Sequence, residues 1–409
     1  MRFVVLIVTA FVAFNMYLDR ACISQVKEQA GRDLNLDQFD FDWIFSAFFW
    51  TYALAQVPAA AISKRLGLRF TLAACCTLWS VFTIVTGAAN SFVTILCARF
   101  FVGLFEAAAY PSASAVIRNW FPVEKRGLAN AVVTFGGRSG FVLAMFATPF
   151  LMGQLGSWRI VLVRYGLLGI VAAVIFWLIV RDRPKQATLT EPAQVPDSKS
   201  TPLMALLRSP MVWIASVHQF GVNFGWVFLQ TGMPHFFTDR FGIPENERGW
   251  VTSVPVFVGC FGMILGGVLI DWLTKHFGLK ASRVIPLSGW LFIAAVAYMS
   301  TAFAFSPWLA VACLGIMAFA IDAANPAYWA FSQDIGKEHA AASLGFGNMI
   351  GNFGAALSPK ILGFVSVQYG WTAMFIAGGL AFLLSAIVGL FLDPRKTIAF
   401  ESPKPNVAS

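Results

Sequence analysis

Two ionisable residues lie inside one apolar run of the sequence. Arg99 and Glu106 belong to the stretch RFFVGLFEAAAYP at 99–111, within an apolar run from about 92 to 117 that is long enough to cross a bilayer as a helix. At 3.6 residues per turn they share nearly the same helix face, roughly 10 Å apart along the axis. Charges at that depth usually face a bundle interior or a wet cavity, so they indicate an ion or substrate path. The alternative is a structural ion pair, or an arginine that reaches the membrane surface.

Other charged residues also lie in apolar runs. Asp19 and Arg20 end the first run, and because adjacent residues are about 100° apart on a helix, one can face a cavity while the other meets a neighbouring helix. Arg138 lies in GGRSG at 136–140, where the glycines allow close helix packing and leave room for a guanidinium. The set also includes Arg164, Asp322 near the middle of the tenth run, and Lys360, which we expect to extend to the membrane surface.

Arginines outnumber carboxylates in this buried set when Lys360 is left out. The set is Arg20, Arg99, Arg138 and Arg164 against Asp19, Glu106 and Asp322. A low-dielectric cavity with surplus guanidinium charge favours an anion, and arginine offers a bidentate match to carboxylate. Burial and arginine neighbours act on a carboxylate in opposite directions, so it can exchange protons as the cavity opens to each side. These residues therefore predict proton-coupled binding of an anion.

Polar and aromatic residues in the same runs could complete a pocket. Each one alone is more often a hydrogen-bond partner between helices than a ligand, so we expect about half of them to contact substrate. The candidates are Tyr52, Gln219, Asn223, Asn325, Tyr328, Trp329, Asn348 and Asn352.

The composition is that of a polytopic membrane protein with the lipid bilayer as a partner. The chain is 58% hydrophobic and 12% charged, with a mean hydropathy of +0.71, whereas an average soluble domain is about 25% charged. The six cysteines show no CxxC spacing and the four histidines are scattered, so we predict no metal site, no disulfide framework and no cofactor. The net charge of +9 is attributed to cytoplasmic loops and not to nucleic-acid binding.

Twelve apolar runs position these residues. The first, from 3 to 22, imitates a signal peptide, but it carries Asn15, Asp19 and Arg20 where a cleavage site would need small residues, so we predict a retained helix. The other runs fall at about 41–63, 70–89, 92–117, 127–152, 158–180, 210–237, 248–270, 284–304, 308–332, 341–366 and 370–392.

A polar, proline-containing stretch separates two sets of six runs. We predict an N-terminal six-helix bundle at 1–182, a flexible linker at 183–207, a C-terminal six-helix bundle at 208–394 and a tail at 395–409. Most of the 29 Lys and Arg residues fall in loops on the side of the two termini, which predicts cytoplasmic termini in a bacterial inner membrane.

The two halves show a weak internal repeat. Pro149 and Gly153 match Pro359 and Gly363, and the same offset pairs Gly137 with Gly347, Arg138 with Asn348 and, with a small slip, Trp158 with Trp371. Two related six-helix halves are a transporter architecture with a site near the midplane. A chance match of a few Gly and Pro residues is the alternative.

Four segments together resemble the major facilitator superfamily and, within it, the anion:cation symporter family. They are YLDR at 17–20, RFFVGLFEAAAYPSASAVIRNWFPVEKRG at 99–127, SVPVFVGCFGMILGGVLID at 253–271 and NMIGNFGAALSP at 348–359. The resemblance implies an all-α membrane fold of twelve transmembrane helices in two pseudo-symmetric bundles. By the same match, Asp19 and Glu106 correspond to proton-linked carboxylates, Arg20 and Arg99 to anion-contacting arginines, and Tyr17, Tyr52 and Asn352 to pocket-lining positions.

The chain departs from the family pattern at two places. The loop motif GxLxD(R/K)xG is AAISKRLG at 60–67 in the first half, with Lys64 in place of Asp, while the second-half copy keeps Gly267 and Asp271 and is assigned the gating role. Sugar-acid members tend to carry a neutral polar residue near Arg138, so the added positive charge suggests a dicarboxylate or a more strongly anionic substrate.

We therefore predict a secondary transporter and not an enzyme. It would move a small organic anion, a sugar acid such as a hexuronate, galactonate or glucarate, with protons by alternating access. Asp322 is a possible third proton site, and we expect a monomer. The alternatives are sodium-coupled or exchange transport of another mono- or dicarboxylate, transport of a neutral or cationic drug, and a membrane sensor or enzyme.

Overall fold

The computed structural model describes residues 1–121, 123–182, 203–337 and 340–398, and these residues form helices joined by short turns, with no strand among them. The predicted all-α membrane class is confirmed, because nine described helical stretches are long and apolar enough to cross a membrane. Two of these, α12 (Gly249–Thr301) and α14 (Ala340–Gly389), turn back at Gly278 and Gly370, where φ is 79° and 81°. A φ in this region favours glycine, so each long helix supplies two spans.

The remaining predicted spans correspond to single helices or to short sets of helices. Two spans are broken: α4 (Phe92–Glu106) continues as α5 (Ala109–Trp120), and α9 (Pro210–Trp226) continues as α10 (Phe228–Thr231) and α11 (Met233–Phe241). The single helices are α1 (Arg2–Leu34), α2 (Gln38–Leu66), α3 (Leu68–Gly87), α6 (Val123–Leu155), α7 (Trp158–Ile179) and α13 (Pro307–Gly336). Residues 183–202 of the predicted linker lie outside the described residues, and its last part forms α8 (Leu203–Arg208).

Local sequence explains where several helices begin and end. Asp37 and Asp40 form a capping box at the start of α2, and the Ser91 and Ser306 side chains accept backbone N–H bonds at the starts of α4 and α13. Asn35 ends α1 in the left-handed conformation. The first predicted run lies within α1, which continues to Leu34, well beyond the signal-peptide-like part; its retention stays a prediction.

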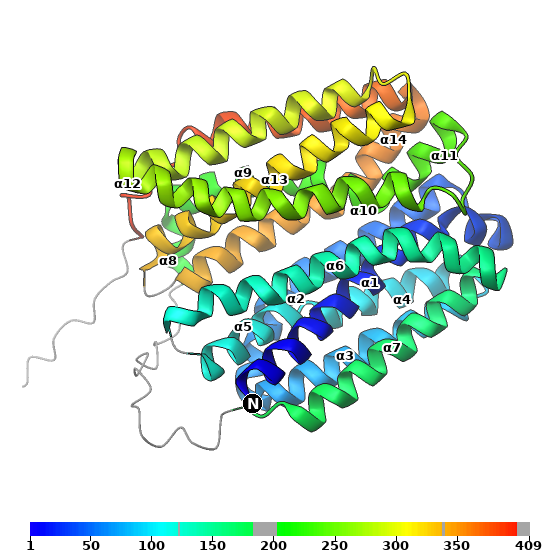
Figure 1. Cartoon of the computed structure of the whole chain (residues 1–409), viewed down its shortest axis with the longest axis horizontal. Coiled ribbons are helices and arrows are strands. Elements are labelled where there is room, and N and C mark those ends of the chain that lie inside the picture. The colour runs from blue at the N-terminus through cyan, green and yellow to red at the C-terminus, as the bar shows by residue number, and fades with distance from the viewer. Residues whose placement is uncertain (122, 183–202, 338–339, 399–409) are drawn as a thin grey trace, which may run out of the picture.

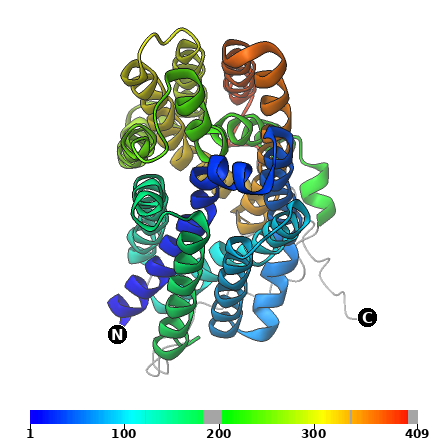
Figure 2. The ribbon, with the colours of Figure 1, turned by 90° about the vertical axis from the view of Figure 1, so that its right-hand side faces the viewer.

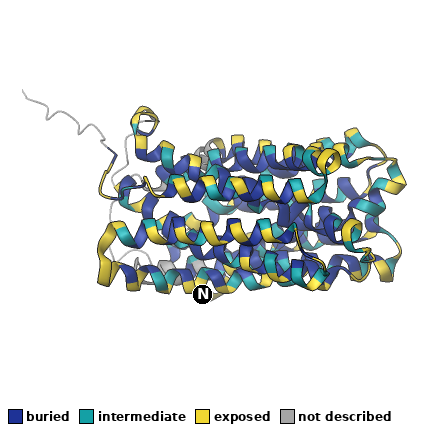
Figure 3. Cartoon of the chain, turned by 90° about the horizontal axis from the view of Figure 1, so that it is seen from above, coloured by how far each residue is buried: buried dark blue, intermediate teal, exposed yellow. Residues whose placement is uncertain are grey.

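Helices α1–α7 and α9–α14 form two bundles that lie side by side (Figures 1 and 2). Figure 1 places α8 at one end of the molecule and α11 at the other, and these are called the α8 end and the α11 end below. Exposed residues recur along the outward sides of the helices (Figure 3), and many are large and apolar, such as Leu178, Ile264 and Val268. Such walls suit contact with lipid.

Corresponding contacts in the two bundles support the predicted repeat. The Trp158 indole donates to Asp33 at 2.7 Å, and the Trp371 indole donates to Asp239 at 2.6 Å, so each bundle joins its first and sixth spans in the same way. Gly137 and Gly347 also correspond. A Cβ at Gly137 would meet the Tyr17 ring and the Tyr110 hydroxyl, and one at Gly347 would meet the Tyr328 hydroxyl.

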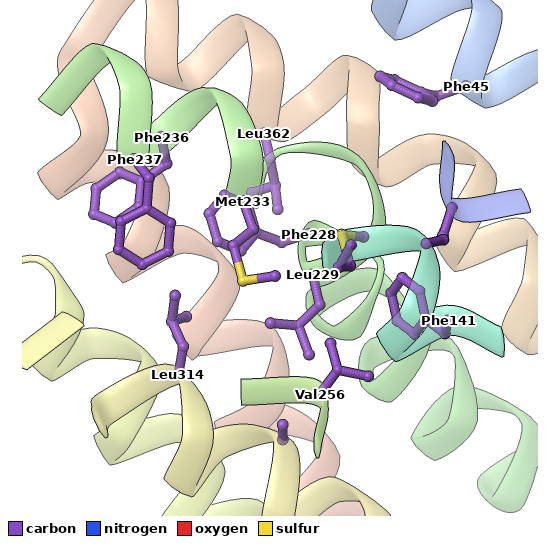
Figure 4. Packing of buried hydrophobic residues seen from close by; sticks show 14 of the residues in the cluster. Phe45, Phe141, Phe228, Leu229, Met233, Phe236, Phe237, Val256, Leu314 and Leu362 are labelled. Atoms are coloured by element: carbon purple, nitrogen blue, oxygen red, sulfur yellow. The ribbon is translucent and has the colours of Figure 1, made fainter. Parts of the chain in front are cut away.

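Apolar packing joins the two bundles most extensively toward the α11 end. One buried cluster contains side chains of both bundles, including Phe45 of α2, Phe141 of α6 and Phe236 of α11 (Figure 4). Near the α8 end, a separate cluster around Leu206 and Phe331 belongs to the second bundle alone. A further cluster, formed mainly by the first bundle, includes Val227, Ala355 and Ala356 of the second, so apolar contact between the described parts of the bundles is more extensive in the first cluster.

The glycines of α6 allow it to lie directly against α1. A Cβ at Gly140 would fall 2.8 and 2.9 Å from the carbonyl carbon and Cα of Phe14, closer than side-chain carbons approach backbone. Gly136 faces Ala10 in the same way. The close packing predicted from GGRSG is confirmed, and no other residue type fits at these two positions without moving the helices.

We therefore expect Gly140→Leu to push α6 away from α1, at a cost of about 1–3 kcal/mol or more. The melting temperature of the purified protein in one detergent should fall, together with the yield of monodisperse protein. Gly289→Leu is the matched control, because the Gly289 position is exposed and its Cβ would meet nothing within 4 Å. Equal melting temperatures for the two variants would contradict the close-contact account of α6.

Candidate functional site

A buried ion pair joins the end of α1 to the end of α4. Arg20 Nε and Nη2 donate to the same Glu106 oxygen, Oε2, at 3.1 and 2.8 Å, and the two residues are 7% and 0% exposed. Glu106 is the last residue of α4, just before the chain breaks and restarts as α5. Pro111 in the first turn of α5 lacks the N–H that a continuous helix would need there. The break thus places a carboxylate at a helix terminus inside the bundle.

Aromatic rings surround the Arg20 guanidinium. Its central carbon lies 4.9, 4.9 and 4.6 Å from the ring centroids of Tyr17, Phe48 and Tyr52. Ring faces attract a guanidinium and exclude water from its sides, so the charge is held in the ring enclosure while its N–H edges remain the groups that bind an anion. Glu106 Oε1 is buried and has no hydrogen-bond partner among the described residues.

Asp19 and Arg99 lie beside this pair within the first bundle. Arg20 meets Glu106 of a neighbouring helix, whereas Asp19 accepts a hydrogen bond from Asn15 Nδ2 of its own helix at 2.9 Å. Arg99 Nη1 donates to the backbone oxygen of Asp19 at 3.4 Å, and its guanidinium carbon lies 4.9 Å from the Phe48 ring centroid. Glu106 therefore forms its ion pair with Arg20 and not with Arg99 on its own helix.

A second buried ion pair crosses between the two bundles. Arg138 Nη2 of α6 donates to Asp322 Oδ1 of α13, and both residues are buried. The Arg138 guanidinium carbon also lies 5.2 Å from the Trp226 ring centroid at the end of α9. Gly259 leaves room for the Asp322 carboxylate, because a side-chain Cβ at that position would lie only 2.7 Å from Asp322 Oδ2. The contact unites a charge from each half near the middle of the spans.

The predicted surplus of buried arginines is wrong. Arg164 is exposed on α7, on the same side as Leu167 and Val171, because the buried face of that helix is formed by Tyr165, Gly169 and their helical neighbours. Of the seven residues in the predicted set, six are buried, and these three arginines and three carboxylates are formally neutral among themselves. As predicted, Lys360 lies at the surface; its Nζ is 2.7 Å from the centroid of the exposed Trp43 ring.

The other pocket candidates form two groups around the centre. Asn348 donates to Gln56 across the bundles at 3.2 Å, Asn352 donates to the Asn348 backbone at 2.8 Å, and Gln219 donates to Asn223 at 3.2 Å. On α13, Tyr328 is buried, its ring stacked on His218. Asn325 is half-buried, and Trp329 is 40% exposed.

Sequence reasoning missed three participants in these contacts, Gln56, Phe48 and Trp226. Gln56 is a polar residue in an apolar run and follows Tyr52 by one helical turn, so its position was a usable signal. Phe48 and Trp226 lie among 41 Phe and 14 Trp residues, and nothing in the sequence distinguishes them from core residues.

The predicted gating residues remain apart from this centre. Asp271 is exposed on α12, Gly267 is half-buried, and a Cβ at Gly267 would meet nothing within 4 Å. Lys64, the first-half counterpart, has a side chain outside the described residues. Their gating role stays a prediction.

A polar network closes the α11 end between the bundles. Arg248 of the second bundle is 0% exposed and donates to Gln25 Oε1 at 2.9 Å and to Glu28 Oε2 at 2.7 Å. His235 also contacts Glu28, at 3.2 Å, and Gln25 donates to Thr252 at 3.0 Å. Arg248 lies at the first position of the predicted run 248–270, and its burial depends on α1 meeting α12, which the sequence does not show.

The two-bundle fold and the buried charges at its centre define a membrane transporter. The family model described as Major Facilitator Superfamily matches residues 9–359, and the chain belongs to this superfamily. Its members similar to this chain are transporters and not enzymes, so this protein is a transporter with several membrane-spanning helices.

Curated relatives match nearly the full chain. The hexuronate transporter of Bacillus subtilis (strain 168) is 27% identical over 92% of both chains. A probable galactarate/D-glucarate transporter of Escherichia coli (strain K12) is 30% identical over 86% of this chain and 84% of its own. The D-galactonate transporter of Escherichia coli O6:H1 (strain CFT073) is 26% identical over 94% of this chain and 95% of its own.

Among solved structures, the fold is similar to a bacterial homologue of the human lysosomal transporter Spinster in an inward-facing, occupied conformation. The TM-score is 0.79 with 21% identity, over 95% of this chain and 96% of that chain. At this identity the likeness concerns the fold.

The Arg20–Glu106 geometry predicts strong energetic coupling between the two residues. Arg20→Leu leaves a buried carboxylate without its counter-ion, which typically costs about 3–5 kcal/mol. The double variant Arg20→Leu/Glu106→Leu should be more stable than Arg20→Leu alone, by melting temperature in one detergent. Arg164→Leu is the control and should lie close to the parent, since Arg164 is exposed. Strictly additive effects of the two single changes would contradict the pairing.

The Arg248 network predicts that the α11 end opens more often when Arg248 is removed. Met145 lies buried beside this network and serves as a reporter when changed to cysteine in a background without the six native cysteines. We expect Arg248→Met to raise the rate of labelling by a water-soluble maleimide several-fold. Arg240→Met is the control, because Arg240 is exposed at the same end. Equal labelling rates in both variants would contradict the prediction that Arg248 helps to keep the α11 end closed.

Proposed function

We propose that the protein carries a sugar acid across the bacterial inner membrane together with protons, by alternating access between its two bundles. The observation that carries this proposal is the Arg20–Glu106 pair, a guanidinium enclosed by aromatic rings and bonded to one buried carboxylate oxygen. The names of its relatives, transporters of hexuronate, galactarate/D-glucarate and D-galactonate, support a sugar acid as the substrate.

In this proposal, Glu106 and the substrate carboxylate compete for Arg20. The planar guanidinium offers the same N–H edge to either carboxylate, so the substrate displaces Glu106 when it binds. Glu106 then becomes a buried carboxylate without a counter-ion, which is costly unless it takes a proton. Its Oε1, buried and unpartnered in the described structure, is the atom that would hold that proton. Substrate and proton are thereby bound together.

Charge balance gives a second reason for coupling. The buried set of Arg20, Arg99, Arg138, Asp19, Glu106 and Asp322 is formally neutral. An anion entering alone would leave a net negative charge in a low-dielectric interior, whereas an anion entering with a proton leaves the set neutral. Charge balance thus calls for a cation to enter with the anion, and in the proposal this cation is a proton held at Glu106, with Asp19 as a neighbouring proton-exchanging carboxylate.

Alternating access in the proposal uses the contacts between the bundles. Ion pairs of Arg248 and Arg32 with Glu28 and Glu245 connect the described residues of the two bundles at the α11 end. Opening at that end would break these contacts, and the bundles would then approach each other near the α8 end. We place the α8 end in the cytoplasm, on the basis of the Lys and Arg residues of the loops there.

Glu106→Gln tests the coupling, because glutamine keeps the shape of a protonated glutamate. Proteoliposomes with this variant should lose proton-driven accumulation of the transported sugar acid but keep exchange of labelled for unlabelled substrate. Glu106→Asp is the control and should regain part of the accumulation, since it restores a titratable carboxylate. If Glu106→Gln still accumulated substrate against a gradient, the proton site would lie elsewhere.

A further inference from the structure

We propose that Arg138 forms a second anion site and that Asp322 is its resident carboxylate, displaced when a substrate with two carboxylates spans the centre. This inference rests on the proposed function, because it assigns the far end of the sugar acid that Arg20 binds. It makes the protein selective for dianionic sugar acids. It also predicts a stoichiometry of two protons for each dianion, with one proton on Glu106 and one on Asp322.

The Arg138–Asp322 contact leaves most of the guanidinium free. Among the described residues, the hydrogen bond of Arg138 is a single one, from Nη2 to Asp322 Oδ1. An arginine has five N–H donors, so a ligand carboxylate could bind it through two of them in the geometry that arginine favours. The Arg138 side chain is 11% exposed, so its remaining donors are not completely enclosed by protein.

The arginines of the two anion sites are linked through Tyr17. The Arg20 guanidinium carbon lies 4.9 Å from the Tyr17 ring, and a Cβ on Gly137, next to Arg138, would lie 2.8 Å from the same ring. Tyr17 also packs against Phe141, with ring centroids 6.3 Å apart. Both guanidinium groups thus belong to helices that meet at one half-buried tyrosine, and the proposal is that one extended molecule binds both.

The α13 face that carries Asp322 becomes more exposed toward the α8 end. Asn325 and Trp329 follow Asp322 by three and seven residues and so lie on the same side of the helix. Asp322 is 3% exposed, Asn325 is half-buried and Trp329 is 40% exposed. This gradient connects the second site with the α8 end of the molecule.

The charge at Arg138 occurs in one half of the internal repeat only, because the corresponding residue of the other half is neutral. Asn348 occupies the corresponding position of α14 and contacts Gln56 of the other bundle, as Arg138 contacts Asp322. The Asn348 contact joins two neutral amides, which is sufficient for a contact between bundles. A structural latch alone therefore does not need two buried charges, whereas an anion site needs the guanidinium.

The protonation requirement follows from the displacement. When a ligand carboxylate takes Arg138, Asp322 loses its counter-ion and is held in a buried position, so it binds a proton, as proposed for Glu106. A dianion entering with two protons leaves the buried set neutral, and a monoanion entering with one proton does so too. Proton stoichiometry therefore reports which sites are used.

Gluconate and glucarate are suitable probes because they share one carbon chain and differ in carrying one or two carboxylates. In proteoliposomes of the unaltered protein, we expect glucarate to be preferred and to enter with two protons per molecule, and gluconate with one. Uptake of labelled substrate and the change in a trapped pH dye give these ratios. If glucarate also entered with only one proton per molecule, the second site would be overturned, regardless of the results with any variant.

The variant to compare is the double change Arg138→Gln/Asp322→Asn, because it removes both charges and leaves neither unpaired. Loss of a charge-assisted bidentate contact should lower the ratio of glucarate to gluconate apparent affinity at least tenfold. Arg164→Gln, on the exposed side of α7, is the control and should keep the parent ratio. An unchanged ratio in the double variant would mean that the pair is only a latch between bundles.

The failure of this inference differs from the failure of the proposed function. If neither gluconate nor glucarate nor any other sugar acid enters, the function proposed for Arg20 fails and the second site fails with it. If sugar acids enter with protons but those with one carboxylate bind as tightly as those with two, the proposed function stands. Only the assignment of Arg138 is then overturned.

Discussion

A charged side chain held away from water must meet an opposite charge or several polar partners, and this requirement organises the centre of the molecule. Arg20 meets Glu106, Arg138 meets Asp322, and Arg99 meets the backbone of Asp19. The rings of Tyr17, Phe48 and Tyr52 shield one of these charges without neutralising it. Arg20 and Arg138 are therefore held by an opposite charge and still present groups that an anion recognises, whereas Arg99 Nε is buried without a hydrogen-bond partner among the described residues.

The same constraint connects binding to movement. The two pairs differ in topology: Arg20–Glu106 lies within the first bundle, whereas Arg138–Asp322 joins the two bundles. A ligand that replaces a carboxylate in the first pair changes the charge inside one rigid body. A ligand that replaces Asp322 also removes a bond between the bodies, so occupancy and the relative position of the bundles become linked.

Close helix contacts supply the rigidity that this arrangement needs. Gly136 and Gly140 bring α6 against α1, so Arg138 and Arg20 are carried by helices whose spacing is determined by backbone contact. At the α11 end, the apolar cluster around Phe236 and the Arg248 network hold the bundles together. A balance of firm packing within bundles and breakable polar contacts between them suits a protein with two access states.

The amino-acid sequence is sufficient to predict the apolar spans, the class of fold and the close packing at GGRSG, because hydropathy and helical periodicity are local properties. It also indicated the repeat, since matching positions occupy matching places in each bundle. The pairing of Glu106 with Arg20, the outward direction of Arg164 and the burial of Arg248 are known only from the folded chain. Periodicity shows which residues share a face of a helix, but the neighbour that this face meets depends on contacts between residues far apart in the chain.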